Sequence, residues 1–136
     1  MNEIDLASVP VRALNERLHR LPADSNDRLW RVVNPRGAHA IAAGLTVPVQ
    51  VEIDGHVGYY CAGMNEQATV IVRGHAGTGL AENIMSGVVR VTGNASQSAA
   101  ASGRGARLVT LGHRTLRADA VPVAVISILQ FLWDAG

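Results

Sequence analysis

Histidine is the residue type in this sequence best placed to do chemistry. His56 and His75 are separated by one 19-residue interval, and His113 lies two such intervals beyond His75, with Asn94 midway between them. If the chain folds in coils of that length, neighbours in the series come within about 5 Å, close enough for two ligands of one metal ion. A ladder of solvated side chains at a bend explains the same spacing. We favour the ladder, because Asn94 interrupts the series and no carboxylate or thiolate shares it.

Cys61 is the single cysteine, and it follows His56 by five positions. A thiol beside an imidazole base is a common catalytic nucleophile. Cys61 nevertheless shares its repeat position with Leu80 and Ala99, which indicates an interior site where the thiol acts as a small hydrophobic group. A lone cysteine also excludes an internal disulfide and fits a reducing compartment.

Four residues are candidates for contact with a partner protein. Tyr59 and Tyr60 are adjacent, so we expect them on opposite faces, and an exposed tyrosine is a suitable interface anchor. Glu82 and Asn83 interrupt a series of small or apolar residues. Glu82 either faces a partner subunit or lies at a solvated bend, and we favour the bend.

A glycine repeat organises the chain around these residues. Four glycines recur with a 19-residue period: Gly55, Gly74, Gly93 and Gly112. Apolar residues alternate before the first three, in residues 51–53, 70–72 and 89–91, which is typical of a strand with one buried face. A unit of this length is too short for two packed helices or a propeller blade, and it suits one coil of a β-solenoid.

The predicted fold is therefore all-β, a right-handed parallel β-helix (solenoid) of 19-residue coils. An imperfect earlier coil is expected, with residues 36–39 one position out of phase with Gly55 and residues 42–44 aligned with residues 61–63. Glycine marks the bends, where the backbone needs positive φ or close approach.

A short amphipathic helix is predicted before the coils. Ser8 is the expected N-cap and Pro10 lies in the first turn, with four apolar residues on one face: Val11, Leu14, Leu18 and Leu21. This helix either caps the open end of the solenoid, which we favour, or binds a partner. The predicted organisation is a helix and lead-in in residues 1–34, β-helix coils in residues 35–112, and a divergent tail in residues 113–136.

Composition narrows the class of partner and the location. The net charge is +1, with 48% hydrophobic and 17% charged residues, so we expect neither nucleic acid nor a membrane as partner. The N-terminal segment lacks the basic and apolar regions of a signal peptide, which predicts a cytoplasmic protein.

Four stretches carry a resemblance to a known family: NPRGAHAIAAGL, GHVGYYCAGMN, GHAGTGLAENIMSG and GNASQSA. They resemble the glycine-repeat (GXGXG) β-helix domain at the C-terminus of the glutamate synthase large chain, a fold that one of the subunits of formylmethanofuran dehydrogenase shares. The likeness is closest to the stand-alone β-helix subunit of N-methylglutamate synthase and related glutamate-synthase-like complexes. It covers roughly residues 10–112.

The resemblance implies a non-catalytic scaffold in an oxidoreductase complex of amino-acid metabolism. Amidotransferase-like and flavin subunits would be its partners, with FMN and an iron–sulfur cluster in a partner and no cofactor in this chain. No catalytic residue is implied here, and no activity is expected of the chain alone. Two alternatives stay open. One is a solenoid enzyme, acyltransferase-like, with an inter-coil site at His56 or His75, and the other is a stand-alone structural repeat protein.

The tail departs from the repeat. Thr110 falls at the inward position of Ile53, Arg114 replaces a small apolar residue, and Pro122 stands at the position of Gly103. Domains of the resembled family continue for several more coils. We therefore favour a truncated or frameshifted tail over a natural cap, and reading the other frames beyond residue 112 for glycine-rich 19-residue coils tests this.

Overall fold

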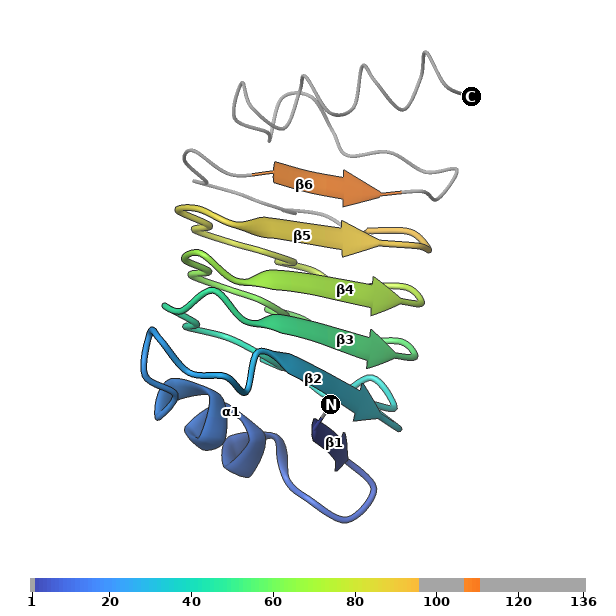
Figure 1. Cartoon of the computed structure of the whole chain (residues 1–136). Helices are drawn as coiled ribbons and strands as arrows, with labels where there is room; N and C mark the ends of the chain where they lie inside the picture. The colour runs from blue at the N-terminus through green and yellow to red at the C-terminus, as the bar shows by residue number, and fades with distance from the viewer. Residues whose placement is uncertain (1, 96–106, 111–136) are drawn as a thin grey trace.

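The computed structural model of the chain describes residues 2–95 and 107–110. Its strands form one parallel sheet in chain order (Figure 1). The strands are β1 (Asn2–Asp5), β2 (Leu29–Val33), β3 (Gln50–Asp54), β4 (Thr69–Arg73), β5 (Val88–Val91) and β6 (Arg107–Thr110), and helix α1 (Val11–His19) lies between β1 and β2.

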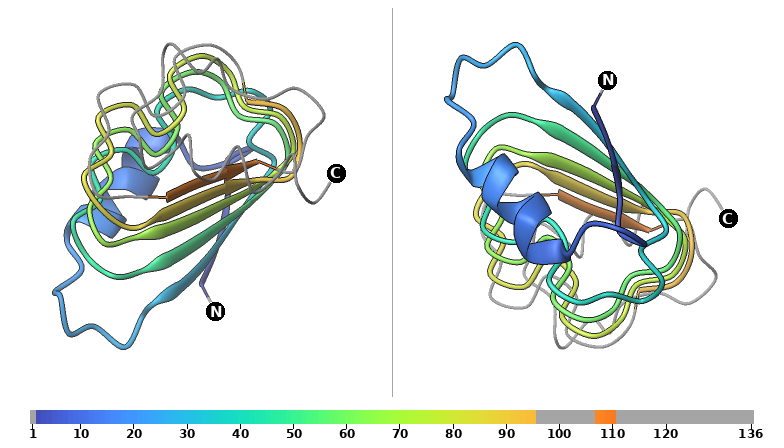
Figure 2. Two further views of the ribbon diagram at one scale, coloured as in Figure 1. Left: turned by 90° about the horizontal axis from the view of Figure 1, so that it is seen from above. Right: turned by 90° about the horizontal axis from the view of Figure 1, so that it is seen from below.

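The chain winds as a right-handed solenoid. In Figure 1 the strands run from left to right in front, and each coil lies above the one before it. The view from above in Figure 2 shows the return segments on the far side of the sheet. The predicted fold class is confirmed.

The predicted register is also confirmed. Val51 pairs with Val70, and Val70 pairs with Val89, so each coil advances by one 19-residue period. Thr110 pairs with Val91, as the repeat predicts. The predictions for Gly112, His113 and the tail in residues 113–136 lie outside the described residues.

The core consists of columns of small side chains. Six inward strand residues are fully buried: Val51, Ile53, Val70, Val72, Val89 and Val91. On the return side, Cys61 and Leu80 form one buried column, and Ala62 and Ala81 form another. Burying each valine or isoleucine side chain contributes about 1.5–3 kcal/mol, so stacked columns replace the aromatic core that the composition lacks.

The first coil is longer than the others. Leu29 pairs with Gln50, which is a 21-residue step. The predicted alignment of residues 42–44 with residues 61–63 is wrong by one position. Positive φ recurs at Ala42, Ala62 and Ala81, which aligns residues 42–44 with residues 62–64. The offset between the first and second coils therefore falls from 21 residues on the strands to 20 residues on the return arcs. A search for a fixed period of 19 residues does not reveal this change.

The return arcs share an unusual backbone. Positive φ recurs at every second residue in three successive arcs: Ala40, Ala42 and Gly44; Tyr60, Ala62 and Met64; Gly79, Ala81 and Asn83. A left-handed conformation costs a non-glycine residue about 1–2 kcal/mol. Hydrogen bonds between coils offset that cost, as where the Tyr60 N–H donates to the Thr78 carbonyl at 2.9 Å.

Helix α1 begins two residues later than predicted. Pro10 is the N-cap, and its carbonyl accepts from the N–H groups of Ala13 and Leu14. The prediction of Ser8 as N-cap is wrong, because the Ser8 N–H turns back to the Asp5 carbonyl at 3.1 Å. The predicted apolar face is present, with Leu14 and Leu18 fully buried.

The helix caps the first coil, as we favoured. Asn15 donates from Nδ2 to the Ala40 carbonyl at 2.9 Å and accepts at Oδ1 from the Ala42 N–H at 2.9 Å. Nε2 of His19 lies 2.7 Å from the Ala43 carbonyl. The Ala42 N–H is a group that a preceding coil would otherwise bond, since the equivalent Ala62 N–H donates to the Ile41 carbonyl. Sequence reasoning placed residues 1–34 before the coils, yet β1 and β2 already belong to the sheet. Among residues 2–95 and 107–110, no helix is long and apolar enough to cross a bilayer.

Candidate functional site

A repeated hydrogen bond joins histidines to the next coil. The His75 N–H donates to Nδ1 of His56 at 2.8 Å, and the Asn94 N–H donates to Nδ1 of His75 at 2.9 Å. A similar bond occurs one coil earlier, where the Tyr59 N–H donates to Nδ1 of His39 at 3.0 Å. Each imidazole therefore works as a backbone acceptor between two coils.

A glycine precedes each of these backbone donors, and the contacts explain why. A Cβ on Gly93 would overlap Nδ1 of His75, and a Cβ on Gly58 would overlap Nδ1 of His39. A Cβ on Gly74 would lie 2.6 Å from the carbonyl carbon and oxygen of Gly55. Gly58, Gly74 and Gly93 are therefore required mainly for close approach between coils.

The geometry favours the ladder interpretation of His56 and His75 over a metal site. Their rings are parallel within 7° with centroids 4.9 Å apart. Because Nδ1 of each ring accepts a backbone hydrogen bond, the proton of the neutral ring lies on Nε2, which leaves no free lone pair for a metal. Among the residues that the structure describes, no group of three or more histidine, cysteine or acidic side chains could hold a metal ion.

Replacing both His56 and His75 with asparagine should leave the fold and metal content nearly unchanged. Asparagine already stands at position 94 of this column, and its side-chain oxygen is an acceptor of similar reach. We expect a change in unfolding free energy below about 1 kcal/mol by urea denaturation. Loss of a bound metal from the double variant, measured by elemental analysis, would restore the metal hypothesis.

Cys61 lies in the core, as predicted. It is fully buried, and burial raises the pKa of its thiol to about 12. The protonated thiol is a poor nucleophile. His56, the base that its spacing suggested, is exposed and bonds to the next coil instead. The structure does not bring the two together.

The candidate interface residues lie on or beside the return arcs. Tyr59 is 57% exposed and stacks on His39 with ring centroids 3.6 Å apart, whereas Tyr60 is half-buried against Gly63. One exposed tyrosine of the pair was predicted and is found. Glu82 is half-buried and Asn83 is exposed. Contact of these residues with a partner stays a prediction.

Sequence reasoning missed an ionic network on the outer face of the sheet. Arg31 bonds to Asp54 at 2.6 Å, and Arg73 bonds to Asp54 at 3.0 Å and also to Glu52. The hydrogen bond from Arg73 lowers the pKa of Glu52. Partial burial acts to raise the pKa of Asp54, but hydrogen bonds from Arg31 and Arg73 outweigh it, and the net shift is downward. The 21-residue first coil concealed the pairing of Arg31 with Asp54.

This network should make part of the stability acid-sensitive. Because the pKa values of Glu52 and Asp54 are lowered on folding, their contribution is complete above the unfolded values near 4 and is lost as the pH falls below them. At pH 7 we expect Arg73→Met to cost about 1 kcal/mol in urea denaturation. The difference from wild type should shrink toward zero by about pH 2. A difference independent of pH would show that Arg73 stabilises the sheet by packing alone.

A buried asparagine was also missed. Asn65 is fully buried, and its Nδ2 donates to the carbonyls of Ala68 at 2.8 Å and Ser86 at 3.0 Å. It therefore joins the second and third coils from inside. The residue one period later is Ile84, so Asn65 is a polar residue at an otherwise apolar repeat position. That interruption was the signal in the sequence that could have identified it.

Comparison with known proteins gives one informative relative. The chain is similar to Protein GlxC of Rhizobium meliloti (strain 1021). The two are 55% identical over 89 residues, which is 65% of this chain and 39% of GlxC. The chain thus spans well under half the length of this relative. No family model matches the chain, and no solved structure matches it.

Proposed function

We propose that this chain is a non-catalytic scaffold subunit of a glutamate-synthase-type oxidoreductase complex, with N-methylglutamate synthase as the leading candidate. Its partners would be amidotransferase-like and flavin subunits in the cytoplasm, and the partners would carry FMN and an iron–sulfur cluster. The resemblance in the glycine-rich stretches and the similarity to GlxC support this assignment.

The observation that carries the proposal is the structural use of the motif residues. Gly74 and Gly93 allow close approach between coils, and His56 and His75 accept backbone hydrogen bonds across them. Cys61 is buried in the core. The residues that carry the resemblance therefore have structural roles, as a scaffold requires.

An enzyme with a site at His56 or His75 is less well supported. A general base needs an unprotonated nitrogen that can reach the substrate, and Nδ1 of both rings is already engaged. The outward Nε2 atoms carry protons in this arrangement.

The isolated chain tests the proposal. Purified alone, it should show no stoichiometric flavin or iron–sulfur absorbance and no glutamate-dependent activity. A cofactor bound in a one-to-one ratio after removal of all partner subunits would overturn the scaffold assignment.

A further inference from the structure

The return arcs of the second and third coils carry most of the exposed large apolar side chains in the described part of the chain. Those side chains are Leu29 on β2, and Tyr59, Met64 and Met85 on the arcs. The two methionines are 46% and 45% exposed. Exposed apolar groups gathered in one region mark an interaction surface more often than scattered ones do.

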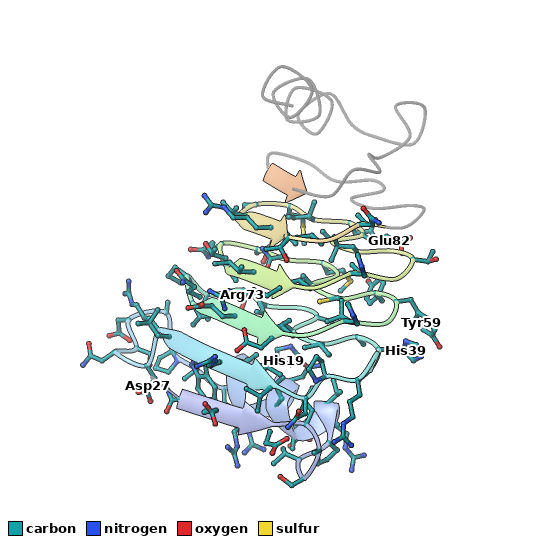
Figure 3. All side chains as sticks on the ribbon, turned by 90° about the vertical axis from the view of Figure 1, so that its right-hand side faces the viewer. His19, Asp27, His39, Tyr59, Arg73 and Glu82 are labelled. Carbon is teal, nitrogen blue, oxygen red and sulfur yellow. The ribbon has the colours of Figure 1, made fainter. Side chains whose placement is uncertain are left out.

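Met64 and Met85 belong to adjacent coils that hydrogen bonds hold in register. The Met64 N–H donates to the Glu82 carbonyl at 2.8 Å, and the Met85 N–H donates to the Asn65 carbonyl at 2.9 Å. Figure 3 shows Tyr59 and Glu82 on the same side of the solenoid, away from Arg73 on the sheet. We call this surface the arc face, and define it by Tyr59, Met64, Glu66, Glu82, Asn83 and Met85.

Within the described part of the chain, the arc face carries negative charge without a compensating cation. Glu66 and Glu82 are half-buried there, and neither forms an ion pair with any described residue. Lysine and arginine are absent from residues 37–72 and 74–89, the whole of both arcs. The acids of the sheet face differ, because Glu52 and Asp54 are neutralised by arginines.

The backbone beneath this surface is held in place while its side chains can adapt. Left-handed Tyr60 and Met64 are fixed by bonds between coils, so little backbone order would be lost on binding. Methionine fits its flexible side chain to varied apolar partners.

We propose that the arc face docks a basic amphipathic helix of a partner subunit, with lysine or arginine placed against Glu66 and Glu82 and apolar residues against Met64 and Met85. Charge complementarity selects this occupant. An anionic membrane surface would be repelled by the two carboxylates. The proposal rests on the scaffold function, since it requires a partner subunit.

A pair of synthetic peptides tests whether the arc face binds a basic amphipathic helix in preference to an acidic one. One is a helical amphipathic peptide of about 18 residues built from leucine and lysine, and the other has glutamate in place of lysine. By calorimetry the full chain should bind the lysine peptide only, and binding should weaken as salt rises from about 0.05 M to about 0.5 M. Equal binding of both peptides would overturn the proposal.

Matched variants locate the site. Glu66→Gln with Glu82→Gln should weaken binding of the lysine peptide about tenfold, and Met64→Ser with Met85→Ser should weaken it by a similar factor. Glu3→Gln with Glu16→Gln removes the same charge from exposed positions at the N-terminal end and should have little effect. An equal loss in both glutamate pairs would show attraction to net charge alone, which contradicts the assignment.

Purification of the chain with its partners, taken together with the peptide experiment, distinguishes failure of the arc-face proposal from failure of the scaffold proposal. If the wild-type chain is recovered with flavin subunits and the Glu66/Glu82 variant is recovered with them equally well, the scaffold role stands and the arc face is wrong. If the peptide contrast holds but the chain is recovered without any flavin protein, the arc face stands and the proposed complex is wrong.

Discussion

Replacement of Gly74 by alanine should lower the free energy of unfolding by about 3 kcal/mol or prevent folding, as severe overpacking does. The new Cβ would lie 2.6 Å from backbone atoms of Gly55 in the preceding coil. Backbone cannot move aside as a flexible side chain can, so the two coils must separate. Their separation would also lengthen the bond between the His75 N–H and His56, which is 2.8 Å in the structure. Urea denaturation followed by circular dichroism measures the loss.

Gly37→Ala is the matched control. Gly37 has a φ of 73° and nothing within 4 Å of an added Cβ, so alanine there meets only the left-handed backbone cost of about 1 kcal/mol. If the two substitutions cost the same, close approach is not the reason for the glycine repeat, and conformational freedom at the bends must explain it.

Asn15→Ala should lower the free energy of unfolding by about 2 kcal/mol, because it removes two hydrogen bonds and leaves the Ala40 carbonyl and the Ala42 N–H unpaired. Helix propensity alone predicts the opposite sign, since alanine favours a helix over asparagine by about 0.5 kcal/mol. The sign of the change in thermal or urea unfolding therefore reports the capping role directly.

Glu16→Ala is the control for this variant. Glu16 is exposed on the same helix, and its replacement should change stability by less than about 0.5 kcal/mol. Greater stability of Asn15→Ala than of wild type would mean that α1 contributes little to closing the first coil.

The parallel fold was predictable because the repeat is regular where the coils are regular. Gly55, Gly74 and Gly93, with apolar alternation before each, place three strands in register without further information. The first coil was placed less accurately, since its 21-residue step breaks the period. The short β1 has no repeat partner in the sequence at that period, and only its pairing with β2 reveals it.

The candidate site was predictable in position but not in detail. The spacing of His56 and His75 indicated neighbouring side chains about 5 Å apart, and their ring centroids lie 4.9 Å apart. It did not indicate that Nδ1 accepts a backbone hydrogen bond, because that depends on how closely Gly74 and Gly93 let the coils approach. The acidic character of the arc face was also hidden, since Glu82 comes beside Met64, on the arc next to Glu66, only when the coils stack.

The scaffold assignment is tested most directly by affinity purification of the tagged full chain from cells that express it, with identification of the recovered subunits by mass spectrometry. We expect amidotransferase-like and flavin–iron–sulfur subunits in fixed stoichiometry, with the flavin absorbance following those subunits when the complex is dissociated in salt. Recovery of the chain alone, or with flavin still bound to it after dissociation, would contradict the account.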